Sequence, residues 1–564
     1  MKEILVESNG EQTQVALMEE GQLAEIYIER SLHNRLVGNI YRGRVENVLP
    51  GMQAAFVNVG LEKNAFLYVG DAVPPRSVGE DGETQQDECC LLIQDVLKEG
   101  QELLVQVMKE PVGTKGARIT TNITLPGRYL VLMPTVDYVG ISRRIELENE
   151  RDRLRELAVG LKPEGMGLIV RTVTEGLSRE DVEQDIRGLV NLWKKIQAKA
   201  ANHGAPVLIH KELELVQRIV RDLFTEDIGR MTVNNRFMYD KLLEAIDFLA
   251  PGFKSKVQLL ERPDLFQDYP IEAEIQRALK KKVWLKSGGY LVIDQTEALT
   301  VVDVNTGKYV GTTSLEDTVL NTNLEAALEI SRQLRLRDIG GIIVIDFIDM
   351  VSLEHRQRVL GVLEQACRKD KTKTNILGLT QLGLVEMTRK KSRQGLQSVM
   401  TRSCPYCDGA GRVSSEETVA LKVKQEILEN AERTLAPALL LDAHPLVAAQ
   451  LIGTGGHILA ELEKRTGKRI LIRGMESIHL EEYKLKLLHS KQEIAALSSP
   501  LDVGQILEVF IEEPHAQQPR AGIARVNGMV VTVDNGGEHV GQKVNVEVIK
   551  VQRTSAKAIL VTRN

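Results

Sequence analysis

The chain has 564 residues, of which 43% are hydrophobic and 27% are charged, and its formal net charge is −6 at pH 7. These values exclude a disordered chain and a uniformly basic nucleic-acid coat, although they allow local basic grooves, and the length predicts about three to five domains. Five cysteines, with no apolar leader and no run of 18 apolar residues, exclude a disulfide scaffold and a membrane span, so we expect a cytoplasmic protein.

The first predicted domain spans residues 37–119, where short β-branched runs alternate with Gly and Pro. This pattern is typical of a small closed barrel. A polar stretch over residues 74–88 interrupts the strands and is predicted to be a loop. Phe56 and Phe66 lie among basic residues, which suits stacking on single-stranded bases. A lone Phe on a strand is more often a core residue, so both interpretations stay open.

Residues 120–214 are predicted to be mixed α/β, with a long helix that begins after Ser178. Asp181 follows this serine by three residues, as in a capping box, and the apolar residues behind it recur at helical spacing. Residues 215–278 are predicted to be largely helical. The chain is therefore expected to change from strand-rich to helix-rich after the barrel.

Residues 279–400 alternate strands and helices, which predicts a core α/β domain. Two apolar strands in it end in the aspartates Asp303 and Asp346, and Asn305 faces the same side of its strand as Asp303. If the strands are neighbours, the carboxylates converge, and a hard cation such as Mg²⁺ would relieve their repulsion. That ion could hold a nucleophilic water and polarise a phosphodiester oxygen. Alternatively, each aspartate caps a helix or turn after its strand.

Cys404 and Cys407 form the only C-x-x-C pair, in a glycine-rich turn that resembles a zinc knuckle. Structural zinc takes four ligands, so either nearby histidines or a second chain must supply the other two. The second option implies a dimer that shares one zinc. A redox-active or unligated pair is the alternative, but a redox role would favour a thioredoxin-like βαβ context, which the sequence does not indicate.

The segment after the cysteines is predicted to hold two further domains. Residues 416–495 form a small α/β domain, in which Gly453 and Gly456 bound a G-x-x-G turn between a helix and a strand. This turn resembles the KH-type loop that clamps an RNA backbone, and a glycine turn for tight helix packing is the alternative. Residues 500–564 are predicted to be all-β, with a hairpin turn at residues 535–537.

These features together resemble the ribonuclease E/G family over roughly residues 1–412. The motifs that carry the resemblance are Val301-Val-Asp303-Val-Asn305-Thr-Gly307, Asn321-Thr-Asn-Leu-Glu-Ala326, Arg332-Gln-Leu-Arg-Leu-Arg-Asp338, Gly341-Ile-Ile-Val-Ile-Asp346-Phe-Ile-Asp349-Met350 and Cys404-Pro-Tyr-Cys407. The runs 38–45 and 49–57 look most like the ribonuclease G members of that family. After the cysteine pair the sequence departs from the family pattern, and residues 500–562 resemble a TRAM domain, a small barrel that binds RNA.

The resemblance implies a Mg²⁺-dependent endoribonuclease that cuts single-stranded, AU-rich RNA, leaves 5′-phosphate ends, and acts in rRNA and tRNA processing and mRNA decay. It also implies a multidomain α/β and α+β fold. Its expected parts are an RNase H-like scaffold (1–36 and 215–278), an inserted OB-fold barrel (37–119), a 5′-phosphate sensor domain (120–214), a DNase I-like catalytic domain (279–400), a zinc link (401–415), the small KH-like domain (416–495) and a C-terminal β-barrel (500–564).

The same resemblance assigns roles to individual residues. Asp303 and Asp346 would bind Mg²⁺, with Asn305 positioning the ion or the scissile phosphate. Cys404 and Cys407 would bind a zinc shared between protomers, in a homodimer or a dimer of dimers. The implied substrate-binding residues are Phe56, Phe66 and Lys115 in the barrel, Lys373 near the substrate path, and Gly127, Val131, Arg143, Arg171 and Thr172 in the sensor of a 5′-monophosphate.

Two other functions stay open from the sequence. A non-catalytic RNA-binding scaffold in ribosome assembly would suit several RNA-binding modules, but it has no need for the Asp303, Asn305 and Asp346 set. A DNA-directed nuclease could use the same metal chemistry, since no motif identifies a 2′-hydroxyl contact. The chain lacks a long disordered tail, so we expect no degradosome assembled on it.

Overall fold

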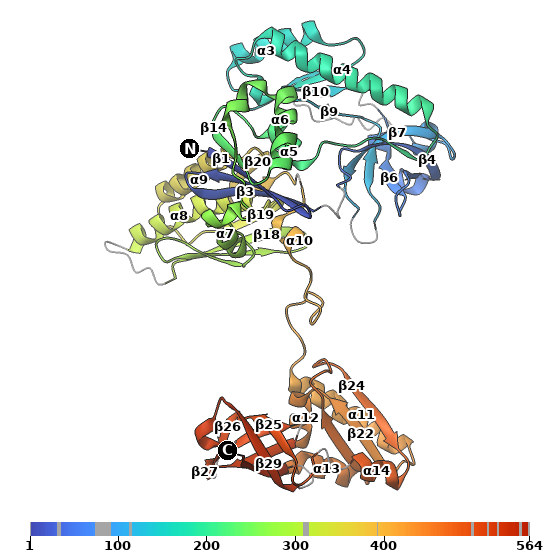
Figure 1. The fold of residues 1–564 in the computed structure, drawn as a ribbon, viewed down its shortest axis with the longest axis vertical. Coiled ribbons are helices and arrows are strands. Elements are labelled where there is room, and N and C mark those ends of the chain that lie inside the picture. The colour runs from blue at the N-terminus through green and yellow to red at the C-terminus, as the bar shows by residue number, and fades with distance from the viewer. Residues whose placement is uncertain are drawn as a thin grey trace. The chain divides into compact units, whose positions relative to one another are not determined.

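The computed structural model describes residues 2–30, 35–73, 92–111, 115–307, 315–391, 393–497, 501–515, 518–526, 529–551 and 555–561. The chain forms two compact units, Met1–Thr401 and Arg402–Asn564, which are both drawn in Figure 1. The predicted loop over residues 74–88 lies outside the described residues. No helix among the described residues is both long and apolar enough to cross a membrane.

The N-terminal strands form a five-stranded sheet with a later part of the chain. In spatial order its strands are β15 (Val257–Leu259), β14 (Ile228–Val233), β1 (Lys2–Ser8), β2 (Gln12–Glu19) and β3 (Gln22–Arg30). β1 pairs in parallel with β14, and helices α5 (Leu215–Asp222) and α6 (Arg236–Leu249) share an apolar core with this sheet. The prediction that residues 215–278 are largely helical is therefore incomplete, because β14 and β15 lie within them.

The predicted barrel is confirmed as a closed barrel of five strands. In order around it they are β4 (Ile40–Leu49), β5 (Ala54–Asn58), β6 (Ala65–Tyr68), β8 (Arg118–Thr120) and β7 (Glu102–Lys109), and β7 pairs back to β4. Gly43 allows the close approach of two strands, since a Cβ there would lie 2.7 Å from a methyl carbon of Val57. Alternate residues such as Val45 and Leu67 fill the interior, so the intervening side chains face outward.

The segment after the barrel forms a four-stranded sheet backed by two helices. The sheet order is β11 (Val139–Ile141), β12 (Gly167–Val170), β10 (Leu130–Met133) and β9 (Leu125–Pro126), and the helices are α3 (Glu148–Leu161) and α4 (Arg179–Asn202). The Ser178 hydroxyl accepts the backbone N–H of Asp181 at 3.3 Å, which confirms the predicted start of α4. The predicted apolar face of this helix, which includes Trp193, is buried.

A six-stranded sheet forms the core of residues 279–400. Its order is β16 (Lys282–Trp284), β17 (Tyr290–Gln295), β18 (Leu299–Asn305), β19 (Gly341–Asp346), β21 (Val385–Arg389) and β20 (Thr374–Leu379). Helix α8 (Leu315–Leu336) connects the parallel neighbours β18 and β19, which confirms the predicted βαβ unit, and α9 (Leu353–Cys367) packs beside α8. One face of the sheet contributes to the core with these helices, and the other carries exposed side chains.

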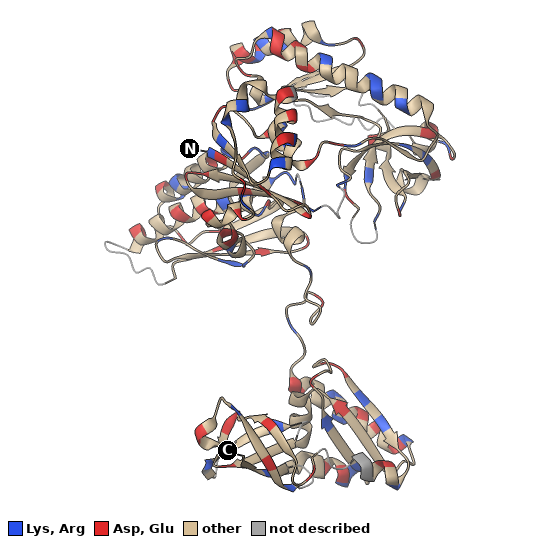
Figure 2. Ribbon diagram, in the orientation of Figure 1, with Lys and Arg blue, Asp and Glu red and all other residues tan. Residues whose placement is uncertain are grey.

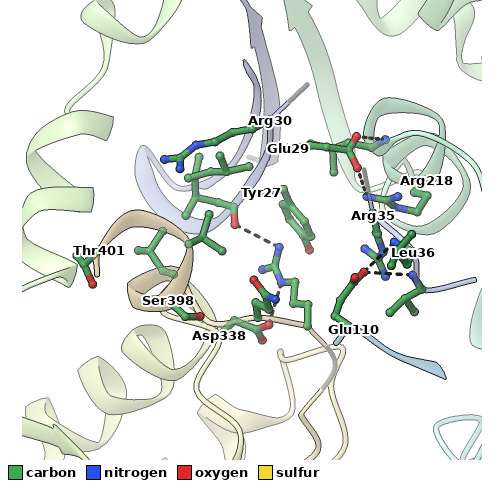
Figure 3. A pocket seen from close by; sticks show the side chains of 18 of the residues that line it. Tyr27, Glu29, Arg30, Arg35, Leu36, Glu110, Arg218, Asp338, Ser398 and Thr401 are labelled. Atoms are coloured by element: carbon green, nitrogen blue, oxygen red, sulfur yellow. Dashed lines mark hydrogen bonds and ion pairs between the residues drawn. The ribbon is translucent and has the colours of Figure 1, made fainter. Parts of the chain in front are cut away.

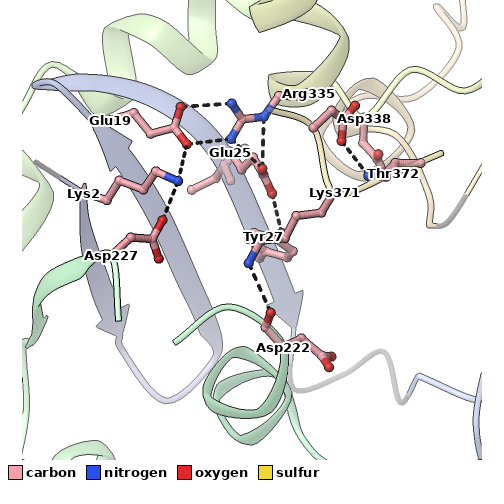
Figure 4. A network of polar contacts seen from close by, with 12 residues as sticks. Lys2, Glu19, Glu25, Tyr27, Asp222, Asp227, Arg335, Asp338, Lys371 and Thr372 are labelled. Carbon is pink, nitrogen blue, oxygen red and sulfur yellow. Dashed lines mark hydrogen bonds and ion pairs between the residues drawn. The ribbon is translucent and has the colours of Figure 1, made fainter. Parts of the chain in front are cut away.

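Buried ion pairs connect α8 to the N-terminal sheet, as Figure 4 shows. Arg335 donates hydrogen bonds to Glu19 of β2 and Glu25 of β3, at distances between 2.8 and 3.1 Å. Burial alone would lower the pKa of Arg335, but its hydrogen bonds and ion pairs with the two carboxylates raise it. Because each of these buried charges has a partner, the contacts fix the end of α8 against β2 and β3.

The second unit begins with a three-stranded sheet packed against helices. The strands are β23 (Arg469–Gly474), β22 (Ala438–Ala443) and β24 (Tyr483–Leu488), and the helices are α11 (Glu416–Arg433), α12 (Pro445–Ile452) and α13 (His457–Thr466). β22 and β23 are parallel, so a βαβ unit does follow the cysteine pair, contrary to the expectation. The glycine turn lies between two helices, α12 and α13, and not before a strand. A Cβ on Gly453 would lie 2.7 Å from the Ile458 side chain, so tight packing accounts for this glycine.

The predicted all-β region forms a six-stranded sheet around one apolar core. Its order is β25 (Ile506–Phe510), β29 (Lys543–Val551), β30 (Ser555–Leu560), β28 (Met529–Asp534), β27 (Gln518–Val526) and β26 (Glu513–His515). The prediction of a hairpin turn at residues 535–537 is wrong. The strands on either side of these residues, β28 and β29, do not pair with each other, since β28 pairs with β27 and β30. Asn535 adopts a left-handed φ of 60° that leads into a short 3-10 helix, Gly536–His539, so the chain does not reverse directly.

Candidate active site

The two candidate carboxylates lie side by side on neighbouring parallel strands. Asp303 of β18 is the register partner of Asp346 of β19, and both side chains are exposed. Their neighbours Val304 and Ile345 are buried, because successive residues of a strand point to opposite faces. Asn305 lies two residues further along β18 and donates its Nδ2 to Asp303 Oδ2 at 2.8 Å. The set of Asp303, Asn305 and Asp346 therefore shares the exposed face of the sheet.

The electrostatics of the pair follow from this closeness. Partial burial raises the pKa of Asp346, and the negative charges of Asp303 and Asp349 raise it further. Asp349 follows β19 in the loop after the strand and is also exposed. A cluster of carboxylates that repel one another attracts a cation, so the donor set suits a hard divalent ion.

A buried asparagine holds the loop that carries Asp349. Asn323 of α8 donates its Nδ2 to the Ile348 carbonyl at 2.8 Å and accepts the Ile348 N–H on Oδ1 at 3.1 Å. Both backbone groups of Ile348 are thereby satisfied by one side chain. The sequence motif contains Asn323, but sequence analysis gave it no role. A polar residue on the buried face of an apolar helix was the available signal.

No group of three or more His, Cys, Asp or Glu side chains suited to a metal ion occurs among the described residues. The Asp303 and Asp346 pair would therefore act with two carboxylates and leave the remaining positions of an ion to water or substrate. This donor set fits Mg²⁺, which keeps several waters and takes one or two carboxylates. It does not fit the all-protein oxygen cages typical of Ca²⁺.

The candidate RNA-contacting residues of the barrel lie together on its outer surface. Phe56 of β5 and Phe66 of β6 are register partners, half-exposed, with ring centroids 6.0 Å apart in an edge-to-face arrangement. Lys115 is exposed just before β8, the strand that pairs with β6. Figure 2 shows basic and acidic residues interspersed over both units, so a polyanion would depend on such local sites.

The candidate 5′-phosphate sensor has its arginine held by other residues. Arg171, just after β12, donates Nη1 to the Gly127 carbonyl at 2.7 Å and Nη2 to Asp222 Oδ1 at 2.6 Å. Thr172 shares a hydrogen bond of 2.9 Å with Ser142. Gly127, Arg171 and Thr172 are therefore brought together, and Arg171 contacts a carboxylate that sequence analysis missed.

A second carboxylate that could not be identified from the sequence, Asp185 of α4, holds the Gly127 turn. It accepts the backbone N–H groups of Tyr129 and Leu130, and a Cβ on Gly127 would lie 2.6 Å from one of its oxygens. Val131 lies in β10 on the same sheet, and Arg143 is exposed just after β11. Asp185 therefore shapes the turn that presents the Gly127 carbonyl to Arg171.

The remaining candidate, Lys373, is exposed immediately before β20, an edge strand of the six-stranded sheet that carries Asp303 and Asp346. β21 lies between β20 and β19, so Lys373 belongs to the same sheet as Asp346 but not to the carboxylate cluster.

A cavity of about 670 Å³ lies in the first unit. Figure 3 shows side chains that line it. Its wall includes Arg393, whose guanidinium lies 3.8 Å from the centre of the Tyr27 ring and donates to Asp338 at 2.9 Å. Arg218 and Glu29 in the same wall form an ion pair of 3.2 Å. These charges already have partners, and the lining does not include the carboxylate pair, so we assign no ligand to this cavity.

The cysteine pair lies in the second unit, in a turn held by backbone hydrogen bonds. The Gly411 N–H donates to Cys407 Sγ at 3.3 Å, and backbone N–H groups of Tyr406 and Cys407 lower the pKa of the Cys404 thiol. The lowered pKa favours the Cys404 thiolate, the form that binds metal. His479 lies nearby, but its Nε2 contacts the Tyr406 carbonyl at 2.6 Å and its Nδ1 accepts a backbone N–H at 3.2 Å.

Comparison with known proteins identifies related families along most of the chain. The model of the ribonuclease E/G family matches residues 124–392, the model of the thioredoxin-like domain of RNase E/G matches residues 403–488, and the model of the TRAM domain matches residues 500–561. The TRAM resemblance is thereby confirmed. The expected departure from the family directly after the cysteine pair is wrong for residues 403–488, which match the thioredoxin-like domain of RNase E/G. The KH-like role of the glycine turn stays a prediction.

Individual relatives match over most of their length. Ribonuclease G of Salmonella typhimurium (strain SL1344) is 45% identical over 487 residues, which cover 86% of this chain and 99% of that protein. Ribonuclease G of Escherichia coli (strain K12) is 45% identical over 481 residues, which cover 85% and 98%. Ribonuclease E of Nostoc sp. (strain PCC 7120 / SAG 25.82 / UTEX 2576) is 43% identical over 416 residues, which cover 73% of this chain and 58% of that protein.

The clamp on Ile348 can be tested by its contribution to stability. Asn323→Leu leaves the partly buried N–H and carbonyl of Ile348 without this side-chain partner, so we expect the free energy of unfolding to fall by about 1–3 kcal/mol. Urea denaturation measures this change. Asn321→Leu is the matched control, because Asn321 is exposed on the same helix and its replacement should cost less than about 0.5 kcal/mol. Equal losses in the two variants would contradict the clamp.

Proposed function

This chain belongs to the ribonuclease E/G family and is an endoribonuclease, and we propose that it hydrolyses single-stranded RNA at the Asp303–Asp346 pair with the help of Mg²⁺. The observation that carries this proposal is the register pairing of Asp303 with Asp346 on the exposed face of the sheet. Family membership favours an enzyme over the non-catalytic scaffold. RNA processing and decay is the role that the relatives support, and we propose rRNA, tRNA and mRNA as the substrates.

The proposed chemistry assigns separate tasks to the three polar residues. Asp303 and Asp346 would hold Mg²⁺, while the Asn305 amide keeps the Asp303 carboxylate in place through its 2.8 Å hydrogen bond. Bound there, the ion supplies Lewis acidity toward a phosphodiester oxygen and toward water. A carboxylate must be deprotonated to bind a metal, and the pKa of Asp346 is raised. Metal binding should therefore weaken as the pH falls through that raised pKa.

We propose that the barrel contacts the RNA through Phe56 and Phe66. Half-exposed aromatic rings can stack on bases of any identity, and the exposed Lys115 beside them can attract the backbone. Such contacts suit a single strand, whose bases are free to stack. The preference for AU-rich sequence rests on the family resemblance alone.

We further propose that Arg171, Thr172 and the Gly127 turn bind a 5′-terminal monophosphate. Arg171 reaches this position already hydrogen-bonded to Asp222 and to the Gly127 carbonyl. Burial alone would raise the pKa of Asp222, but its contacts with Arg221 and Arg171 lower it, so the carboxylate stays ionised. A terminal phosphate would therefore have to share the Arg171 guanidinium with the Asp222 carboxylate or displace that carboxylate from it. Binding of a 5′-end in this way would be weaker than binding to a free arginine.

We propose that Cys404 and Cys407 bind zinc together with the same pair of a second chain. The lowered pKa of the Cys404 thiol and the glycine-rich turn, in which Cys407 Sγ accepts the Gly411 N–H, support this role. Both ring nitrogens of His479 are engaged, and no third candidate ligand joins the pair among the described residues. Four-coordinate zinc then needs two ligands from elsewhere, which a partner subunit would supply in a homodimer or a dimer of dimers.

The catalytic assignment is tested by one conservative substitution. Asp346→Asn keeps the size of the side chain but removes a charge from the proposed ion site, so we expect cleavage to fall at least about a hundredfold. Binding of single-stranded RNA, measured without Mg²⁺, should change by less than about twofold. The control is Asp294→Asn, which removes an exposed carboxylate on β17, a strand of the same sheet that does not pair with β19. Cleavage of a labelled RNA by Asp346→Asn at the parent rate would overturn the assignment.

Arg171→Gln tests the 5′-end sensor. The parent should cleave a 5′-monophosphorylated RNA about tenfold faster than its 5′-hydroxyl counterpart, because charged hydrogen bonds to the phosphate are lost in the latter. The variant should cleave both at the same rate. Arg153→Gln, which removes a more exposed arginine paired with Glu150 in the same domain, should keep the preference. A preference that survives in Arg171→Gln would exclude Arg171 as the sensor.

Replacing both Cys404 and Cys407 by Ser tests the shared zinc. The parent should contain one zinc per two chains and behave as a dimer or larger, and the double variant should lose zinc and become monomeric. Metal analysis and light scattering measure the two quantities. Cys367→Ala is the control, since Cys367 is buried in the first unit. A zinc-free dimer or a zinc-loaded monomer in the parent would contradict the proposal.

A further inference from the structure

The exposed face of the catalytic sheet carries an aromatic pair beside the carboxylates. Trp284 of the edge strand β16 is 60% exposed, and it is the register partner of Tyr290 of β17. Tyr290 is in turn the register partner of Asn305 of β18. On the basis of the nuclease function proposed above, we propose that Trp284, supported by Tyr290, is a stacking site for a base of the RNA strand being cut.

Strand alternation puts this pair on the same side of the sheet as the carboxylates. Val283 is 6% exposed and faces the helices, so Trp284 must point to the opposite face. A neighbouring row of the same face runs from Lys282 through Val292 to Asp303 and Asp346. Adjacent strands are about 4.8 Å apart, so roughly 10 Å separate the backbone of Trp284 from that of Asn305. A few nucleotides of a single strand can span this distance.

The local contacts make the aromatic pair rigid and positively charged. The ring centroids of Trp284 and Tyr290 lie 5.3 Å apart at an interplanar angle of 62°, an edge-to-face geometry. Lys282 Nζ lies 4.1 Å from the centre of the Trp284 ring and 3.5 Å from that of Tyr290. The lysine braces the two rings and can attract a phosphate backbone, while much of the indole stays open to solvent.

The two tryptophans of the chain differ in their exposure to solvent. The chain contains two tryptophans, and Trp193 is only 6% exposed in the core of another domain. A large aromatic side chain left in water on a sheet that carries candidate catalytic residues suits a binding role. The competing explanation is that Trp284 merely covers Tyr290 at the sheet edge. That explanation predicts an effect on stability and none on RNA.

Tryptophan fluorescence tests stacking without any need for cleavage. Metal-free protein is titrated with a short 5′-phosphorylated single-stranded RNA of adenine and uridine. We expect the RNA to quench the emission of the parent, because a base stacks on the exposed indole. In Trp284→Phe only the buried Trp193 emits, and quenching should disappear. Absence of quenching in the parent would overturn the inference, whether or not the protein cuts RNA.

Cleavage kinetics provide the second arm of the test. Trp284→Ala should lower kcat/KM about tenfold, while Trp284→Phe should stay within about threefold of the parent, because it keeps a stacking surface. The matched control is Phe237→Ala on α6, which removes a 75% exposed ring that also has a lysine, Lys241, 6.0 Å from its centre. If Trp284→Ala cleaves like Phe237→Ala, the stacking site is wrong even though the nuclease function stands.

An abasic substrate locates the stacked base. RNA in which one base near the cut is missing should lose about tenfold in kcat/KM with the parent at a single position. With Trp284→Ala the same abasic RNA should show no further loss, because the two changes remove one interaction. Independent, additive losses would contradict direct stacking. Urea denaturation of Trp284→Ala and Phe237→Ala shows whether either effect arises from unfolding.

Discussion

The apolar packing of β18 beside β19, which holds Asp303 next to Asp346 against their repulsion, is the constraint on which the proposed active site depends. Two apolar strands pair in parallel because their Val and Ile side chains bury one common face, and alternation then turns both aspartates to the other face. The hydrophobic core therefore holds together two like charges that would otherwise separate. The raised pKa of Asp346 reflects this, since burial and the charges of Asp303 and Asp349 act in the same direction.

Several polar contacts support the strands and the loop that carry these carboxylates. Asn323 binds both backbone groups of Ile348 in the loop after Asp346. Strand β21 pairs with β19, and its Arg389 lies opposite Gly341, at the end of β19 away from Asp346. Arg389 forms buried ion pairs with Asp338 at 2.8 Å and with Asp370 at 2.6 Å. Removing one partner of a buried ion pair leaves an unpaired charge and destabilises the protein, although the intact pair adds little net stability. These ion pairs therefore specify the geometry more than they add to the free energy of unfolding. The exposed face that they support carries both the carboxylates and Trp284.

The features that short segments determine could be predicted from the sequence. The closed barrel, the capped start of α4 at Ser178 and the βαβ unit around Asp303 all follow from patterns within short segments. Features that depend on distant parts of the chain were missed. β14 pairs with β1 from more than two hundred residues away, and β28 pairs with β30 instead of reversing into β29. The same reason applies to three side chains. The partners of Arg171 and Arg335 and the neighbours of Trp284 come from distant segments, so they could not be predicted from the sequence.

The most direct test of the central claim is to locate a divalent ion at the carboxylate pair. Crystals of the parent protein soaked in Mn²⁺, a scattering substitute for Mg²⁺, would be measured at the manganese absorption edge. Our account predicts one anomalous peak in contact with both Asp303 and Asp346, which disappears in Asp303→Asn. A manganese-saturated crystal with no peak between the two carboxylates, or with either side chain turned to a backbone partner instead, would contradict it.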